Sequence, residues 1–486
     1  MRPYSYVEEL FMKKKNTLSW NRREFLEATG ATVAAASMGP YLGAQGRLPV
    51  AGRSDWTRFA YDLHNTRFNS RETTLNTSNV GRLKPKWRHE IGAPIQTSPT
   101  VVGDTLFIGA WDGKYHALDA ETGEPKWSYD AEVTPEPRWQ LRTMKSTAQY
   151  DRGRIYFGSG EGELNCVDAA TGKEIWKTKM DPGLRISSSP NIYGDRVLLA
   201  TSGRNAQVLC VDRETGAIRW KFKIVPDREG GGGSSWTSPA VDEQQNIVYN
   251  VTGNPSSFNP PGPLLFTDSI IANDLETGEL LWHYQVRASD PFDLDFSCHP
   301  MIFDAVSPGK LGARRQCVGA GNKTAFFTWD RYTGELLWRV MLTNWATQGG
   351  PWWDSTAVAY NKVYVVSNAI NDRDPITSRS LGLSESVTAA LHAYTGEIVW
   401  WRHNDSMNRA PVCVANGVYY QSLANGNLEA FDAETGKLLW QSSLPSTSRG
   451  GIVIANGNLY TSNGEGGLPT EPRHRYDVFA YSIDGA

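Results

Sequence analysis

The chain has 486 residues, with 49 Lys and Arg against 52 Asp and Glu, which gives a formal net charge of −3. This balance gives no electrostatic case for binding nucleic acid or an anionic membrane. The five cysteines stand at positions 166, 210, 298, 317 and 413, with no C-x-x-C and no haem-attachment motif, so we expect them to be buried strand residues.

The first residues form a pattern typical of exported proteins. Arg22 and Arg23 are followed by Phe25-Leu26 and by an uncharged, small-residue stretch over residues 28–39. That stretch is too short and too weakly apolar to span a membrane, whereas the paired arginines before it indicate export by the twin-arginine route. We predict a signal peptide over residues 1–44 and a periplasmic location.

A polar, irregular segment follows the leader. Four aromatic residues, Trp56, Phe59, Tyr61 and Phe68, are spaced through it. We predict an N-terminal arm over residues 45–82 that packs on the outside of the remaining fold, which spans residues 83–486.

One short phrase returns seven times along that remaining fold. Thr-Gly is followed by Trp four residues after the Gly, and in six copies an Asp stands four residues before the Gly; the sixth copy has His392 instead. The seven tryptophans are Trp127, Trp176, Trp220, Trp282, Trp338, Trp400 and Trp440. The carboxylate can cap the N–H groups of a turn in which Gly takes positive φ, and short β-branched and aromatic runs on either side predict strands.

The spacing of this phrase predicts a propeller. A period of about 40–60 residues is typical of propellers and solenoids, and about four strands per period make one blade. An eighth blade is indicated by the chain ends, because residues 83–87 match the strand after the turn and residues 477–481 match the strand before it. Pairing them would close the ring without an exposed edge. We predict an all-β, eight-bladed propeller, with seven blades as the alternative.

Three successive periods in the middle of the chain are longer than the others. Insertions in a propeller fall in loops at one face, so this length indicates a functional surface. The unusual residues lie here: Trp236 follows a glycine run, Asn254 lies in Gly-Asn-Pro, and Asp293 is followed two residues later by Asp295. In this order they resemble the quinoprotein alcohol dehydrogenases, eight-bladed propellers that hold pyrroloquinoline quinone (PQQ) and a metal ion on the ring axis. The similarity covers nearly all of the chain after the leader.

The resemblance implies a role for each of these four residues. Trp236 would form the stacking floor under the quinone, and Asn254 would offer an amide oxygen to the metal. Asp293 would be a metal ligand and the catalytic base that takes the alcohol proton as hydride leaves for the quinone. Asp295 matches a further ligand found in lanthanide-using members.

Other positions resemble contacts to the cofactor or the metal. Arg152 matches the arginine whose fork binds a quinone carboxylate. Ser187 and Ser202 match hydroxyl donors to the cofactor, and Gln96 stands where the family often has Glu. Asn205 stands at the position of a metal-binding Glu and is neutral.

The chain also departs from the family pattern. Ser146-Thr147 occupy the region of an adjacent-cysteine disulfide, and Trp352 aligns with a cofactor-contacting Asn. The family's Lys or Arg near the quinone aligns with Asn322, and its neighbour Lys323, also a candidate cofactor contact, would point to the other face of a regular strand. These departures leave open a propeller that has lost its cofactor.

We therefore expect a periplasmic dehydrogenase that oxidises an alcohol with PQQ and Ca²⁺ or a lanthanide ion. Because the chain has no haem motif, its electrons would pass to a separate acceptor such as a soluble c-type cytochrome. Two other classes stay open: a non-enzymatic scaffold for outer-membrane or envelope assembly, and a sugar- or polymer-binding module that uses Trp352 and Trp353. Trp236, Asn254 and Asp293 argue against the scaffold.

Overall fold

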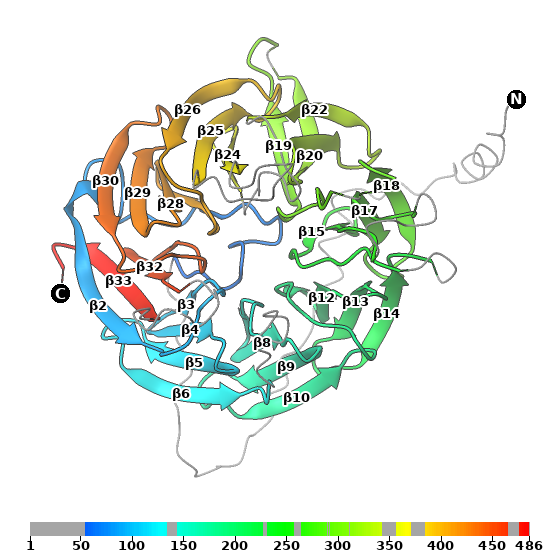
Figure 1. The fold of residues 1–486 in the computed structure, drawn as a ribbon, viewed down its shortest axis with the longest axis horizontal. Helices are drawn as coiled ribbons and strands as arrows, with labels where there is room; N and C mark the ends of the chain where they lie inside the picture. Colours follow the sequence, from blue (N-terminus) through cyan, green and yellow to red (C-terminus); the bar gives the residue numbers. More distant parts are fainter. Residues whose placement is uncertain are drawn as a thin grey trace, which may run out of the picture. The chain divides into compact units, whose positions relative to one another are not determined.

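The computed structural model describes ten segments of the chain: residues 54–133, 143–226, 231–256, 264–288, 290, 292–310, 312–342, 356–370, 384–464 and 476–485. They form eight β-sheets arranged in a ring (Figure 1). Seven sheets have four strands and one has five, and the one helical element in these segments is the 3-10 turn η1 (Val80–Arg82). The predicted eight-bladed, all-β propeller is confirmed.

Each blade has four antiparallel strands, the first of which lies nearest the ring centre (Figure 1), and in one blade β1 (Phe68–Asn69) pairs parallel with that first strand. We number the blades I to VIII along the chain. Blades I to IV are β3 (Thr100–Val102), β4 (Thr105–Gly109), β5 (Lys114–Asp119) and β6 (Pro125–Asp130); β7 (Gln149–Asp151), β8 (Arg154–Gly158), β9 (Glu163–Asp168) and β10 (Glu174–Lys179); β11 (Asn191–Tyr193), β12 (Arg196–Ala200), β13 (Gln207–Asp212) and β14 (Ile218–Lys223); β15 (Ala240–Asp242), β16 (Ile247–Val251), β17 (Ser269–Asp274) and β18 (Leu280–Gln285). Blades V to VIII are β19 (Met301–Val306), β20 (Arg314–Gly321), β21 (Phe326–Asp330) and β22 (Leu336–Val340); β23 (Ala357–Ala359), β24 (Lys362–Ile370), β25 (Ser384–His392) and β26 (Ile398–Asn404); β27 (Cys413–Ala415), β28 (Val418–Ser422), β29 (Asn427–Asp432) and β30 (Leu438–Ser443), with β1 (Phe68–Asn69) as fifth strand; β31 (Val453–Ala455), β32 (Asn458–Ser462), β33 (Asp477–Ile483) and β2 (Leu83–Glu90).

The core lies between neighbouring blades. The second strands are buried on both faces, and all five residues of β4 are buried. Rings from adjacent blades meet there: Tyr115 of blade I stacks on Phe157 of blade II with centroids 4.1 Å apart. Strands enclosed on both sides read as continuous apolar runs rather than as alternating patterns, which explains why β-branched and aromatic residues dominate these segments.

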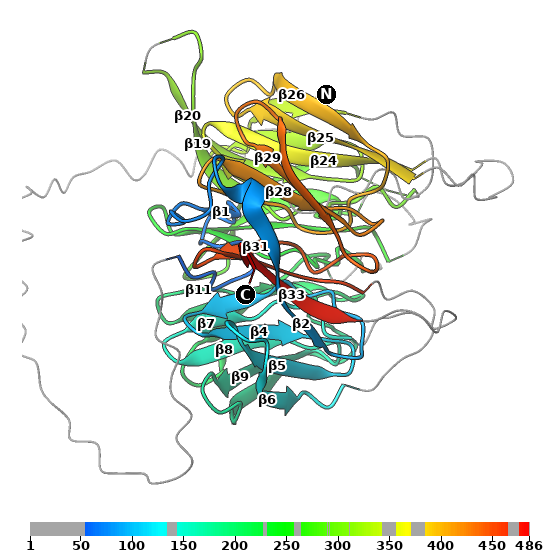
Figure 2. The same cartoon turned by 90° about the vertical axis from the view of Figure 1, so that its left-hand side faces the viewer.

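The two ends of the chain share blade VIII. Strand β2 pairs antiparallel with β33, from Leu83 opposite Ile483 to Glu90 opposite Asp477. The two strands lie side by side in both Figure 1 and Figure 2. The predicted closure of the ring by its terminal segments is confirmed: β33 is paired on both sides, with β32 and with β2, and β2 is the outer strand of blade VIII.

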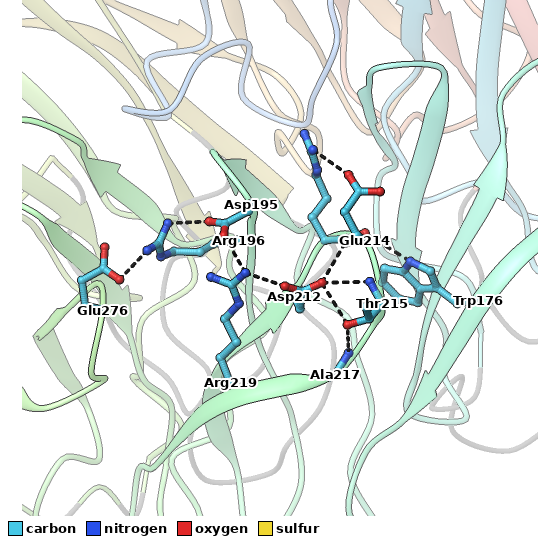
Figure 3. A network of polar contacts seen from close by, with 10 residues as sticks. Trp176, Asp195, Arg196, Asp212, Glu214, Thr215, Ala217, Arg219 and Glu276 are labelled. Carbon is cyan, nitrogen blue, oxygen red and sulfur yellow. Dashed lines mark hydrogen bonds and ion pairs between the residues drawn. The ribbon is translucent and has the colours of Figure 1, made fainter. Parts of the chain in front are cut away.

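The repeated phrase is a contact between blades as well as a turn. In the third copy the Asp212 carboxylate accepts the N–H of Thr215 at 2.9 Å, as Figure 3 shows. The side-chain hydrogen bond from Arg219, followed by the bond from Thr215, holds the pKa of Asp212 well below its usual range. Trp176 of the preceding blade donates to the carbonyl of Arg213 at 3.2 Å. In six of the seven copies the Trp of one blade thus donates to the Thr-Gly turn of the next, and Trp440 donates to Leu83 of blade VIII.

Glycine is required in these turns because the indole lies directly on it. At Gly172 the backbone is left-handed (φ 69°), and a Cβ would come within 2.5 Å of Trp127 Cε3. The copy with His392 keeps the same cap by another route, since His392 Nδ1 accepts the N–H of Tyr394 at 3.2 Å. The phrase therefore specifies both the turn and the spacing between blades.

Residues 56–69 of the N-terminal arm run along the inner strands, so the prediction that the arm packs on the outside of the ring is wrong for this part. The last residues of the arm, Val80–Arg82, lie against the outer strand β30. The backbone of residues 56–69 is bonded to Val101, Tyr150, Val241, Ile302, Val358 and Val414, and the side chains of Arg58 and Asn69 reach Asn191 and Ile454. These eight partners belong to the first strands of all eight blades. An innermost strand has one edge without a neighbouring strand, and the arm supplies hydrogen bonds to the backbone of seven of these strands and to the Asn191 side chain of the eighth.

The two ends of the ring differ in their connections. We call "turn end" the end with the Thr-Gly turns and the turns between the first two strands of each blade. The arm lies there, since Asp55 accepts the N–H of Gly103 at 2.9 Å in the β3–β4 turn. We call "loop end" the other end, with the second-to-third-strand loops and the connections between blades. Among the described residues no helix has the length and apolar character needed to cross a membrane.

Candidate active site

The predicted site residues of the middle blades meet at the loop end. Trp236 lies in the β14–β15 connection, Asn254 in the β16–β17 loop, and Asp293 and Asp295 in the β18–β19 connection. Lys323 lies in the β20–β21 loop. Blades IV and V, together with the connection that enters blade IV, therefore supply all five residues.

Asp293 is held by two side chains through one of its oxygens. Its Oδ1 receives Lys323 Nζ at 2.7 Å and Asn254 Nδ2 at 2.6 Å. Its side chain is 33% exposed, and its backbone is left-handed (φ 58°). A non-glycine residue in that conformation is strained, and such strain collects at functional sites. The carboxylate is therefore fixed in direction while one side of it stays open.

Asp295 lies behind Asp293 and is fully buried. Lys323 Nζ is 2.9 Å from its Oδ1, and the N–H of Asn254 donates to its Oδ2 at 3.3 Å. Burial raises the pKa of Asp295 to about 6, Lys323 opposes the rise and the charge of Asp293 adds to it. The ammonium group thus stands between two carboxylates and is 5.9 Å from the ring centroid of Trp236.

Lys323 points into the site, because residues 322–325 form a turn rather than the regular strand in which it would have pointed to the other face. The Asn322 side chain closes this turn by accepting the N–H groups of Thr324 and Ala325, both at 2.8 Å. The backbone N–H of Lys323 donates to the carbonyl of Asp295 at 2.9 Å. The aligned Asn322 is therefore structural, and its neighbour carries the cation into the site.

Asp268 is a site residue that the sequence patterns missed. It lies at the end of the β16–β17 loop, is 1% exposed, and has no hydrogen bond on either carboxylate oxygen among the described residues. Burial raises its pKa to about 9, with contributions from Asp295 and Asp290 that Arg287 and Lys323 oppose. The available signal was an acidic residue directly before an apolar strand, which without a structure reads as an ordinary loop residue.

The predicted hydroxyl donors lie on the neighbouring loops. Ser202 forms an antiparallel bridge with Arg185, two residues before Ser187, through two backbone hydrogen bonds of 2.9 Å. The buried Ser202 Oγ has no partner among the described residues. Asn205 is exposed and forms a bridge with Gly232, which in turn forms a bridge with Pro255 beside Asn254. The backbone therefore joins the loops of Asn205 and Asn254.

Arg152 is not brought to this site. It lies in the β7–β8 turn at the turn end, with its side chain 72% exposed and 4.0 Å from Asp151. A basic group at the loop end is formed instead by Lys145, Arg185 and Arg449. Burial lowers the pKa of Lys145 to about 8, and the charges of Arg449 and Arg185 add to the effect. Lys145 Nζ lies 5.9 Å from the ring of Trp111.

The remaining predicted positions lie in other parts of the chain. Gln96 is half-buried in the β2–β3 connection at the loop end. At the positions of the family's disulfide, Ser146 Oγ accepts the N–H of Gly158 and Thr147 Oγ1 accepts that of Ser98, both at 2.9 Å. All five cysteines are free and buried. Trp352, Trp353 and the signal peptide over residues 1–44 lie outside the described residues.

The oxygen donors suit a hard cation, although they are not yet arranged around one. Within the described segments no three His, Cys, Asp or Glu side chains stand in ligand geometry, and Lys323 is bonded to both Asp293 and Asp295. Asn254 Oδ1, however, is buried and has no hydrogen-bond partner among the described residues. An unpaired amide oxygen beside two carboxylates is a donor set of the kind that Ca²⁺ and related ions take.

Two sequence profiles match the chain. The profile of the family described as "Glucose/ethanol/alcohol dehydrogenase, beta-propeller domain" matches residues 56–353, and that of "Outer membrane protein assembly factor BamB" matches residues 267–473. The quinohemoprotein alcohol dehydrogenase of Comamonas testosteroni is 28% identical over 369 residues, which cover 66% of this chain and 52% of that protein. The dehydrogenase subunit of a quinone-dependent alcohol dehydrogenase of Gluconobacter oxydans is 26% identical over 423 residues, with 76% and 51% covered. The chain spans about half the length of these curated relatives.

The solved structures share the fold. The crystal structure of the Comamonas testosteroni quinohemoprotein alcohol dehydrogenase superposes with a TM-score of 0.79 at 21% identity, over 90% of this chain and 82% of that one. A europium-containing methanol dehydrogenase gives 0.73 at 19% identity, over 89% and 98%. With its matched region covering most of the described blades, the chain belongs to the glucose/ethanol/alcohol dehydrogenase β-propeller family.

Proposed function

We propose that this chain oxidises an alcohol with PQQ and a bound metal ion. The observation that carries the proposal is the carboxylate of Asp293, held by Lys323 and Asn254 and left one-third exposed near Trp236. When bound, the quinone supplies the redox chemistry by accepting a hydride from the alcohol carbon. The protein supplies orientation, charge and a proton acceptor.

Three groups at the loop end fit the quinone. The half-buried indole of Trp236 offers a face for a flat ring system. The unpaired Ser202 Oγ offers a hydroxyl donor. The basic group of Lys145, Arg185 and Arg449 offers cations to the cofactor's carboxylates, the role that the sequence alignment assigned to Arg152.

The metal would be held by Asn254 Oδ1 with the carboxylates of Asp293 and Asp295. Two carboxylates close together repel unless a cation lies between them, and here Lys323 supplies one positive charge. Because Asp295 adds a second carboxylate where Asn205 is neutral, a trivalent lanthanide should bind more tightly than Ca²⁺.

Asp293 is positioned to act as the base. Among the described residues both of its side-chain partners bond Oδ1, which leaves Oδ2 to accept the proton of the substrate hydroxyl. The proton moves from the hydroxyl oxygen to Asp293 while the hydride leaves the carbon that bears this hydroxyl group. Lys323 acts as a positioning residue that fixes the direction of the carboxylate.

Binding of PQQ tests the proposal directly. The absorbance spectrum of the full chain should change on addition of PQQ with Ca²⁺ or a lanthanide, and a dye-linked assay should report alcohol oxidation. Lys145→Gln should weaken PQQ binding about tenfold or more, whereas Arg152→Gln at the turn end should leave it unchanged. Equal loss in both variants, or a spectrum that PQQ never alters, would contradict the assignment.

Location and electron acceptor belong to the same proposal. The paired arginines support export to the periplasm in a folded state, and replacing Arg22 and Arg23 by Lys should leave the protein in the cytoplasm. The acceptor would be a separate protein such as a c-type cytochrome.

The profile match over residues 267–473 favours one second candidate, an envelope-assembly scaffold. A scaffolding role does not require the ammonium group of Lys323 to be held between the carboxylates of Asp293 and Asp295, at 2.7 and 2.9 Å. A chain that binds neither PQQ nor a metal ion, and turns over no alcohol, would be better explained by this candidate.

A further inference from the structure

Asp268 stands apart from the other buried carboxylates of the described segments. It is 1% exposed, and neither of its oxygens has a hydrogen-bond partner among the described residues. By contrast, Asp290 accepts the N–H groups of Phe292 and Leu294 at 2.8 and 2.5 Å. A buried carboxylate without a cation or hydrogen bonds opposes folding, so its presence calls for an explanation.

Other buried acids have a cation as partner. Asp477 is fully buried and lies 2.8 Å from Arg88 Nε. Asp242 is nearly as buried and lies 3.1 Å from Arg331 Nε. Asp268 has no ion pair of this kind in the described part of the chain, although the fold elsewhere pairs its buried charges.

The backbone places Asp268 next to the proposed metal donors. Its N–H donates to the carbonyl of Gly253 at 3.1 Å. Gly253 directly precedes Asn254 and packs on Asp295, because a Cβ on Gly253 would stand 2.7 Å from Asp295 Oδ2. Asp268 is thus joined to the site through one residue of backbone.

The charges around Asp268 are not balanced by the described side chains. Four carboxylates, from Asp268, Asp290, Asp293 and Asp295, act on one another together with the cations of Arg287 and Lys323. Negative charge in excess of positive charge in a buried region favours uptake of a cation. Asn254 Oδ1, also unpaired, lies in the same loop.

We propose that Asp268 is the charge-balancing carboxylate of this site, which offsets the charge of the bound metal ion and which has no role in the fold without that ion. The inference rests on the proposed function. On this proposal Asp268 lowers the stability of the metal-free protein and raises the stability of the metal-bound protein.

Metal affinity gives the first test. Terbium(III) would be titrated into the full chain, with and without PQQ, and followed by its luminescence. Asp268→Asn removes one charge at nearly constant volume and should weaken terbium binding roughly tenfold or more. The matched control is Asp477→Asn, a buried acid of blade VIII, which should leave terbium affinity unchanged.

Thermal melting without metal gives the second test and does not depend on activity. Asp268→Asn should raise the melting temperature of the metal-free protein by about 2 °C or more, because it removes a buried carboxyl group that has no hydrogen-bond partner among the described residues and whose ionised form burial opposes. Asp477→Asn should lower it, because it leaves Arg88 without its partner. Added terbium should stabilise the parent protein more than it stabilises Asp268→Asn.

The outcomes separate the inference from the proposed function. Terbium binding with equal affinity in the parent and in Asp268→Asn overturns the inference while metal-dependent PQQ binding stands. A lower metal-free melting temperature for Asp268→Asn also overturns it, since the residue would then hold the fold together. A parent protein that binds no terbium, Ca²⁺ or PQQ overturns both.

Discussion

The indole N–H of Trp440 donates to the carbonyl oxygen of Leu83 at 3.0 Å, across 357 residues of sequence. It is the contact that every repeated Trp makes with the following blade, but here its acceptor belongs to the N-terminal strand β2, the outer strand of blade VIII. Strand β2 is paired there with β33, the last strand of the chain. The repeat therefore closes on itself only when both chain ends are present.

Removing the last strand should open the ring. Deleting residues 477–486 takes away β33 and leaves β2 and β32 without their shared neighbour, so two strand edges become available for aggregation. We expect soluble yield to collapse. Deleting residues 484–486 keeps β33 and serves as the control, with yield and melting temperature close to those of the parent. A chain lacking residues 477–486 that melts like the parent would contradict this account of closure.

The arm should hold the inner ends of the blades together through Arg67. This residue is fully buried, its guanidinium donates to the carbonyls of Val412, Phe59 and Ile452, and burial lowers its pKa to about 10. Arg67→Met leaves these acceptors unpaired and should lower the free energy of unfolding by roughly 2–5 kcal/mol. Denaturant melts would measure the loss.

A control on the same arm separates this effect from general damage. Arg71 is exposed, and Arg71→Met should change stability by no more than about 0.5 kcal/mol. Because the arm lies at the turn end, surviving folded Arg67→Met protein should still bind PQQ at the loop end. Equal stability of the two variants would show that the arm contributes little to ring closure.

The local phrase was predictable because its physics is local. Asp, Thr, Gly and Trp at fixed spacing determine a capped turn and its docking surface, and counting copies then gives the blades. The path of the arm was not predictable in this way. Its bonds to Val101, Val241 and Val414 join backbone atoms far apart in sequence, and backbone pairing of an irregular segment leaves no side-chain pattern.

His299 should make stability sensitive to mild acid. It is fully buried, and burial, with Arg67 adding to it, lowers the pKa of His299 to about 3. An unfolded His has a pKa of about 6.5, so below that pH the unfolded chain takes up a proton that the folded protein refuses. Above pH 6.5 the residue contributes no pH dependence; between pH 6.5 and 3 stability falls by up to about 1.4 kcal/mol per pH unit.

Comparing His299→Gln with the parent isolates this contribution. Between pH 7 and pH 5 the parent should lose about 2 kcal/mol more stability than the variant. The surroundings of His299 include Asn65, whose carbonyl lies 3.1 Å from Nε2, and the ring of Phe59, neither of which titrates. If the stability of the two proteins falls in parallel over this range, His299 is not the source of the parent's sensitivity to acid.

At the site, the sequence predicted the residues whose types and order match a known family, but not how the side chains around them are arranged. Trp236, Asn254 and Asp293 were identifiable because their order along the chain resembles a known family. The direction of the Lys323 side chain depended on whether its segment was a regular strand, and the turn at residues 322–325 decided it. Asp268 could not be found at all, since what distinguishes it is the absence of partners inside the described structure, and a sequence does not display burial.

The roles of Asp293 and Trp236 should separate in two measurements. Asp293→Asn keeps the size of the side chain and a hydrogen-bond acceptor for Lys323 but cannot take up the hydroxyl proton. PQQ binding should survive, while dye-linked alcohol oxidation falls about 10²-fold or more, the usual contribution of a positioned base. Trp236→Ala should do the reverse and weaken PQQ binding by roughly 1–3 kcal/mol, as for bases stacked on aromatic side chains. If Asp293→Asn keeps full turnover, the base lies elsewhere, and Asp295, which shares Lys323 with Asp293, becomes the first residue to replace.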